Sequence, residues 1–193
     1  MSERNDEWKH LLLWRHAEAE DESDAGNLAR SLSARGKTQA QAVAAWLLTQ
    51  QKYGGIPQNL QIFVSPAERA QQTVAALRQP FTVDPCLAPG ALPEDYLRLA
   101  GWNHPQGDND FAALECWEEA TWLEERREAE AVLIVGHQPT LGQTAARLLA
   151  QQKAVWNVRK GALWWFAQRQ RAGTPQNVLL AVIDPRTAIA SMR

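Results

Sequence analysis

The stretch LLLWRH (residues 11–16) places an arginine and a histidine directly after a run of large apolar residues. An apolar run of this kind, bounded by charged residues, is typical of a strand that is buried on both faces of a sheet. In open α/β sheets, ligands bind at the carboxyl ends of the parallel strands. The stretch therefore predicts a strand over residues 10–14, and it predicts that Arg15 and His16 lie where a ligand would bind.

Segments with strand and helix patterns alternate along the rest of the chain. Ser33 can cap a helix whose apolar residues recur at helical spacing, and the segment YGGIP (53–57) ends it. Residues 61–64 predict a second buried strand, and Pro66 predicts a helix that starts there and runs to about Arg78. We expect further strands over 81–83, 131–135, 162–167 and 178–183, and helices over 94–99, 111–128 and 140–152.

This order of elements predicts one α/β domain. Alternating strands and helices imply a mainly parallel central sheet with helices on both faces, in three α/β/α layers. The last two strands are joined by a Gly-Thr-Pro loop (173–175), so we expect them to pair as a C-terminal antiparallel hairpin. No internal repeat, low-complexity segment or linker interrupts the sequence. We therefore expect a flexible N-terminus over residues 1–9 and a single domain over residues 10–193.

The composition argues against several classes of partner. The chain has 193 residues, of which 45% are hydrophobic and 22% charged, and its net charge is −2 with no basic tract, so a nucleic acid partner is not expected. The apolar run near the start is too short for a membrane span or for the core of a signal peptide. Cys86 and Cys116 lie in unrelated contexts and suggest neither a disulfide framework nor a metal site. We expect a cytoplasmic protein without membrane contact.

Three of the predicted strands end on a short polar motif: RH (15–16), SPAER (65–69) and GH (136–137). If these strands are parallel, two arginines and two histidines converge on one edge of the sheet. A guanidinium donates paired hydrogen bonds to a phosphoryl group, and a helix N-terminus adds positive potential. Nearby cations disfavour the protonated imidazole, so a histidine among them stays neutral and nucleophilic. The pattern predicts a site for a tetrahedral dianion that needs no metal and no other cofactor.

The motifs also resemble a known family. LWRHAEA (13–19), RSLSARGKTQA (30–40), VSPAERAQQT (64–73) and VGHQP (135–139) occur in the order found in the histidine phosphatase superfamily, also called the phosphoglycerate-mutase-like family. The short chain, the RHA variant and the GHQP segment are most similar to the SixA-type phosphohistidine phosphatases. The resemblance covers about residues 10–185.

The resemblance implies a role for each residue of the predicted site. His16 would be the nucleophile that becomes transiently phosphorylated. Arg15 and Arg69 would bind the phosphoryl oxygens, and His137 would complete the pocket and stabilise the transition state. Arg30 lies where SixA-like proteins often have an arginine, and both substrate contact and solvent exposure are open for it.

The chain departs from the family's pattern at two places. Ala17 stands where members usually have glycine, and we expect its methyl group to be tolerated. Many members place a glutamate after the third strand as a general acid, but Cys86 lies there, and Glu94, Asp95 and Glu18 do not match that position. An imidazole leaving group depends less on a general acid than an alkoxide does. The missing acid therefore favours phosphohistidine over sugar phosphates as the substrate.

An acidic loop over residues 18–24 follows the predicted nucleophile. It is either a solvated surface loop or, if it flanks the pocket, a source of repulsion toward highly anionic metabolites such as bisphosphoglycerate. The sequence shows no basic cluster outside the core pocket that could hold a second phosphate. A mutase function is therefore disfavoured.

Three functions stay open after these arguments. The first is a metal-independent phosphatase that acts on protein phosphohistidine. The second is a phosphatase for small phosphate esters, and the third is a module that binds phosphate or a phosphoprotein without turnover. The expected partner is accordingly a phosphorylated protein or a small phosphorylated substrate. The oligomeric state, and whether the helix over 111–128 is a lid, are also open.

Overall fold

The computed structural model describes residues 8–102, 130–171 and 174–190. The predicted helix over 111–128 and Cys116 lie outside these residues. The strands are β1 (Lys9–Arg15), β2 (Leu60–Val64), β3 (Thr82–Val83), β4 (Ala131–Gly136), β5 (Leu163–Arg171) and β6 (Thr174–Ile183). The α-helices are α1 (Ala34–Lys52), α2 (Glu68–Ala75), α3 (Pro93–Leu99), α5 (Thr140–Ala150) and α6 (Pro185–Ala190), and two 3₁₀ helices are η1 (Asn27–Ala29) and η2 (Pro85–Leu87).

The six strands form one sheet in the order β3-β2-β4-β1-β5-β6. β1 lies between β4, which runs parallel to it, and β5, which runs antiparallel. β2 pairs in parallel with both β3 and β4, and β5 pairs antiparallel with β6. The predicted mainly parallel sheet with a C-terminal antiparallel hairpin is confirmed.

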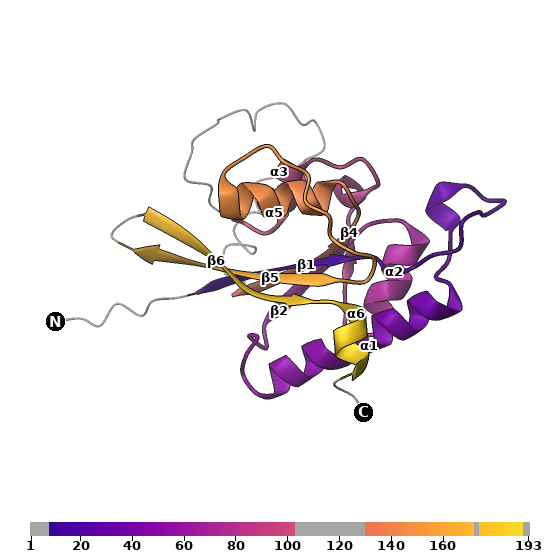
Figure 1. The fold of residues 1–193 in the computed structure, drawn as a ribbon, viewed down its shortest axis with the longest axis horizontal. Helices are drawn as coiled ribbons and strands as arrows, with labels where there is room; N and C mark the ends of the chain where they lie inside the picture. Colours follow the sequence, from indigo (N-terminus) through magenta and orange to yellow (C-terminus); the bar gives the residue numbers. More distant parts are fainter. Residues whose placement is uncertain (1–7, 103–129, 172–173, 191–193) are drawn as a thin grey trace.

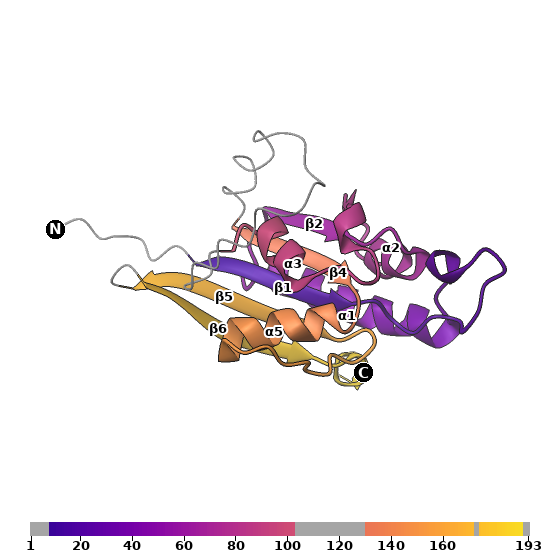
Figure 2. The ribbon, with the colours of Figure 1, turned by 90° about the horizontal axis from the view of Figure 1, so that it is seen from above.

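Helices cover both faces of this sheet (Figures 1 and 2). α1, α2 and α6 pack on one face, and α3 and α5 pack on the other. Leu12 and Trp14 of β1 face the first group, whereas Leu11 and Leu13 face the second. All four side chains are fully buried, and burying a large apolar side chain contributes about 1.5–3 kcal/mol. A strand between two helical layers therefore needs an unbroken apolar run rather than an alternating one.

The helix after β2 begins later and ends earlier than predicted. Ser65 and Pro66 precede it, and the backbone of Ala67 is extended (φ −66°, ψ 131°), so α2 starts at Glu68. The hydroxyl oxygen of Ser65 accepts a hydrogen bond from the Ala67 amide at 3.2 Å, which stabilises a turn in place of a first helical turn. At the other end, Arg78 has a left-handed φ of 54° and cannot continue a helix.

The C-terminal part of the chain is more regular than expected. β5 and β6 extend beyond the apolar residues that predicted them, because their outer, polar ends pair through the backbone from Gln168↔Asn177 to Arg171↔Thr174. α6 was not predicted. Asp184 starts it by accepting a hydrogen bond from the Arg186 amide at 2.9 Å, and Pro185 occupies its first position, as helix starts favour.

The remaining predicted elements agree with the structure to within a few residues. Ser33 caps α1 by accepting a hydrogen bond from the Gly36 amide at 3.1 Å. β1 includes Lys9, one residue earlier than predicted. The division into a flexible terminus and one domain stays a prediction. Among the described residues, no helix is long and apolar enough to cross a membrane.

Candidate active site

His16 follows β1 directly and is held by the sheet. Its amide donates to the carbonyl of Gly136, and its carbonyl accepts from the amide of Gly161, both at 3.0 Å. The ring is buried, with 8% of the residue exposed, and its Nδ1 lies 2.7 Å from the carbonyl oxygen of Ala17. Because a carbonyl can only accept, Nδ1 carries the proton in this contact. A neutral His16 therefore has its lone pair on Nε2.

His137 follows β4 and lies beside His16. The centroids of the two rings are 5.0 Å apart at an interplanar angle of 51°. Nε2 of His137 is hydrogen-bonded to the hydroxyl of Ser65 at 2.8 Å, and its amide donates to the hydroxyl of Tyr96 at 3.2 Å. A Cβ at Gly136 would lie 1.9 Å from that hydroxyl oxygen, so glycine is required for this packing. The Ser65 contact therefore orients the ring, and the Tyr96 contact fixes the backbone that carries it.

Two arginines complete the group. Arg69 lies in the first turn of α2, is only 4% exposed, and donates through Nη1 to the carbonyl of Asn27 at 2.7 Å. Arg15 ends β1 and donates through Nη1 to the carbonyl of Val158 at 2.6 Å. In each guanidinium the Nε is buried and has no hydrogen-bond partner among the described residues. Both positive charges lie close enough to His16 to lower its pKa, so an anion beside this imidazole would be attracted by both arginines.

The electrostatics of the site keep both imidazoles neutral. Burial lowers the pKa of His16 to about 4; the hydrogen bond to the next carbonyl opposes this effect, and the charges of Arg69, Arg15 and Lys160 add to it. The pKa of His137 is likewise lowered to about 3, chiefly by burial and also by His16 and the two arginines. The structure therefore brings the four predicted residues together. Lys160 is an addition that no motif in the sequence indicated.

We expect the neutral imidazoles to make stability depend on pH. In the unfolded chain a histidine titrates near pH 6.5, but the pKa of His16 in the folded protein is about 4. Between these values the unfolded state binds more protons, so the free energy of unfolding falls as the pH falls through this window. At pH 5 the loss due to His16 is about 2 kcal/mol relative to pH 7.

Urea unfolding of the wild type and of His16→Asn at both pH values measures this effect. The variant should lose about 2 kcal/mol less than the wild type on going from pH 7 to pH 5. Equal losses in the two proteins would contradict a neutral, buried His16.

Ala17 fits the structure in place of the usual glycine. It is fully buried and packs against Leu32 and Ala40. Its amide donates to the hydroxyl of Thr73 on α2 at 3.0 Å. The methyl group therefore fills space in a small apolar cluster, which agrees with the expectation that it is tolerated.

Arg30 lies in the loop that carries η1. Its Nε donates to the carbonyl of Glu20 at 2.7 Å, and its Nη1 donates to the side chain of Asn27 at 3.4 Å. The charge of Arg30 lowers the pKa of Arg69, although burial is the larger cause. Arg30 therefore lies near Arg69. Its hydrogen bonds stabilise the loop whose residue Asn27 accepts a hydrogen bond from Arg69.

The three acidic residues considered as general acids all have other partners. Glu94 pairs with Arg147. Asp95 pairs with Arg98 at 2.9 Å and accepts a hydrogen bond from the Leu92 amide. Glu18 accepts a hydrogen bond from the hydroxyl of Ser33 at 3.3 Å and pairs with Arg35 at 3.5 Å. Cys86 lies in η2. The described residues also contain no group of three or more His, Cys, Asp or Glu side chains that could hold a metal ion.

Comparisons with known proteins show which sequences and structures this chain resembles. The sequence profile of the histidine phosphatase superfamily (branch 1) matches residues 11–94. A search of curated proteins finds no match. A protein from Nakamurella multipartitia assigned as the phosphohistidine phosphatase SixA has a similar structure, with a TM-score of 0.63 at 23% identity over 92% of this chain and 96% of that chain.

Two further structures are similar. The protein histidine phosphatase SixA complexed with tungstate has a TM-score of 0.61 at 18% identity over 92% of this chain and 98% of that chain. A protein from Escherichia coli assigned as an alpha-ribazole-5'-P phosphatase has a TM-score of 0.56 at 23% identity over 91% of this chain and 96% of that chain. The resemblance predicted from the motifs is thereby confirmed: the chain matches the histidine phosphatase superfamily in sequence over residues 11–94, and it has the fold of SixA-type structures over nine-tenths of its length.

Proposed function

We propose that this protein is a metal-independent phosphatase that transfers a phosphoryl group through His16. One observation carries the proposal: Arg15 and Arg69, whose Nε atoms have no hydrogen-bond partner among the described residues, lie close enough to lower the pKa of His16, whose neutral ring has its Nε2 lone pair available. A guanidinium binds a phosphoryl group through charge-assisted hydrogen bonds. Tungstate, the ligand of one similar structure, is likewise a tetrahedral oxyanion.

The proposed reaction has two steps. In the first, Nε2 of His16 attacks phosphorus, the bond from phosphorus to the leaving group breaks, and the leaving group takes up a proton from solvent. In the second, water attacks the phosphohistidine, inorganic phosphate leaves, and the imidazole is regenerated. Arg15 and Arg69 donate to the phosphoryl oxygens as charge moves onto them, and preorganised donors of this kind supply a large share of catalysis. His137, held by Ser65, would donate to the same oxygens.

We propose protein phosphohistidine as the substrate, and the acidic residues support this choice. Glu18, Glu94 and Asp95 are each engaged with an arginine, so none is held ready to protonate an alkoxide. An imidazole leaving group depends less on such an acid. Phosphatases for small esters occur among the similar structures, so a small phosphate ester is the alternative substrate.

We further propose a cytoplasmic location, because the two cysteines lie in unrelated contexts and suggest no disulfide framework.

A substrate panel tests the function. A phosphohistidine peptide, sugar phosphates and nucleotide phosphates are compared as substrates, each with and without a chelator. We expect kcat/KM for the phosphohistidine peptide to exceed that of every ester by at least roughly tenfold, with no effect of the chelator.

Each other outcome has a definite meaning. Higher kcat/KM for an ester would assign the protein to small substrates. Loss of activity with the chelator would contradict the mechanism. Phosphate binding without release of phosphate from any substrate would identify a binding module.

A further inference from the structure

A second basic site adjoins the proposed phosphoryl site. A cleft of about 280 Å³ is lined by five cationic side chains: Arg15, Arg35, Arg159, Lys160 and Arg186. They come from the end of β1, the first turn of α1, the loop before β5, and α6. Because these segments are far apart in the sequence, no basic cluster was visible there, and the expectation that none exists outside the core pocket was wrong.

The cleft has an excess of positive charge. Of the described residues that line it, Glu18 and Asp184 are the acidic ones, so these residues together have a formal charge of +3, whereas the whole chain carries −2. A concave surface lined by one sign of charge concentrates counter-ions. The cleft therefore attracts anions although the protein as a whole has a negative net charge.

The two acidic residues orient the cations without covering them. Asp184 pairs with Arg159 at 3.4 Å and with Arg186 at 3.0 Å. The side chains of Arg159 and Arg186 remain 59% and 65% exposed. Lys160 has no hydrogen bond or ion pair within the described part of the chain. The cleft thus presents oriented guanidinium groups and an unpaired ammonium to a ligand.

The cleft and the phosphoryl site share Arg15. Arg15 lines the cleft, and its charge also lowers the pKa of His16. Lys160 lies close enough to His16 for its charge to lower the pKa of the imidazole. A ligand in the cleft can therefore belong to the same molecule as the phosphoryl group at His16.

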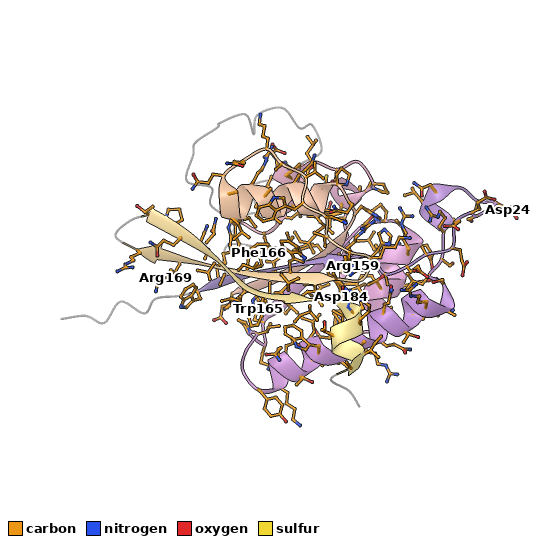
Figure 3. All side chains as sticks on the ribbon, in the orientation of Figure 1. Asp24, Arg159, Trp165, Phe166, Arg169 and Asp184 are labelled. Carbon is orange, nitrogen blue, oxygen red and sulfur yellow. The ribbon has the colours of Figure 1, made fainter. Side chains whose placement is uncertain are left out.

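The acidic loop does not close off this cleft. Figure 3 shows Asp24 at the tip of its loop, well away from Arg159 and Asp184. Within residues 18–24 it is Glu18 alone that lines the cleft, and it is paired with Arg35. Repulsion of anionic substrates by the loop as a whole is therefore not expected at this place.

We propose that the cleft binds a second anionic group, a phosphate or a carboxylate, of the substrate whose phosphoryl group is transferred to His16. The inference rests on the proposed function for the first group. It narrows the substrate class to molecules with two anionic groups, whether these are small phosphate compounds or phosphohistidine segments with a neighbouring acidic residue. The cations of the cleft would act as specificity determinants.

Phosphonates test this inference independently of turnover, because their P–C bonds are not hydrolysed by phosphoryl transfer. Affinities of methylphosphonate, of the diphosphonates from methane to butane, and of 3-phosphonopropionate are measured by calorimetry. We expect at least one doubly anionic compound to bind at least tenfold more tightly than methylphosphonate, a difference of about 1.4 kcal/mol. The 3-phosphonopropionate arm shows whether a carboxylate suffices.

A double variant and a matched control locate the effect. Arg159→Gln combined with Lys160→Gln should reduce the preference for the second anion to about twofold or less. Arg171→Gln should keep the preference for the second anion. Arg171 is exposed and lies at the far end of β5, where it pairs with Thr174. The end of β5 next to the site is Leu163, which pairs with Trp14 of β1. Equal affinity for all phosphonates, no measurable binding by any of them, or an undiminished preference in the double variant would overturn the inference.

A peptide pair identifies the source of the second anion. The ratio of kcat/KM for a phosphohistidine peptide flanked by glutamates to that for the same peptide flanked by glutamines should exceed roughly threefold for a protein substrate. A ratio of one, with the diphosphonate preference intact, assigns the cleft to small substrates. If no substrate is turned over but the diphosphonate preference is present, the proposed function fails and the anion-binding cleft stands.

Discussion

Replacing His16 with alanine should lower turnover by roughly 10⁴-fold or more, because no phosphoryl group can then be transferred to the enzyme. The structure points to this residue through its tautomer. Nδ1 donates to the Ala17 carbonyl at 2.7 Å, and the pKa of about 4 keeps the ring neutral, so Nε2 is available at neutral pH. The measurement is kcat on the best substrate of the panel, together with trapping of radiolabelled phosphate on the protein.

The trapping experiment adds a chemical signature. Phosphate on a histidine nitrogen is labile in acid and stable in base, so quenched wild-type protein should carry label that acid removes and base does not. His16→Ala should carry none.

His10 provides a matched control on the same strand. Burial lowers its pKa as well, and its Nδ1 accepts a hydrogen bond from the indole of Trp165 at 3.1 Å. His10→Gln keeps an acceptor for that indole and should retain turnover within about twofold of the wild type. If His16→Ala retained more than a tenth of the activity, transfer through this imidazole would be excluded.

Replacing Arg69 with methionine should lower kcat/KM by roughly 10²–10³-fold while leaving the fold at least as stable as before. Removing one preorganised donor to a developing charge costs about this much in rate. The stability expectation has a different origin. Arg69 is buried, and within the described part of the chain its Nε has no partner and its side chain donates one hydrogen bond, to Asn27. An apolar side chain in place of an uncompensated buried charge is often neutral or stabilising.

Thermal unfolding with and without phosphate separates the two effects. A ligand that binds only the folded state raises Tm with its concentration, so phosphate should raise Tm of the wild type and not of Arg69→Met. Arg78→Met is the control, because Arg78 is exposed just beyond α2 and should change neither kcat/KM nor the response to phosphate. A phosphate-dependent Tm in Arg69→Met would contradict a role for Arg69 in binding the anion.

Local patterns predicted much of this fold. The strands β1, β2 and β4 are short apolar runs with charged or turn residues at their ends, and α1 has a capping serine and helical spacing, so each could be located without knowledge of its neighbours. Arg15, His16, Arg69 and His137 follow elements that could be recognised in this way. Their convergence was therefore predictable once the strands were expected to be parallel.

Other predictions from local patterns were wrong where a side-chain hydrogen bond or pairing with another strand determined the backbone conformation instead. The start of α2 moved past Pro66 because the Ser65 hydroxyl stabilises a turn. The polar ends of β5 and β6 became strand through pairing with each other, although their sequences lack an apolar run. Such outcomes depend on contacts that periodicity does not record.

The sequence by itself determined which residue types stand at the ends of the buried strands, since burial on both faces demands the apolar runs that precede them. Tertiary structure alone decided which distant groups surround those residues: that Ser65 holds the ring of His137, that Glu94 is paired with Arg147, and which cations gather in the cleft. Arg15 meets the loop before β5 across 143 positions of sequence. Proximity over such a separation arises from the packing of the whole sheet, and no local pattern in the chain encodes it.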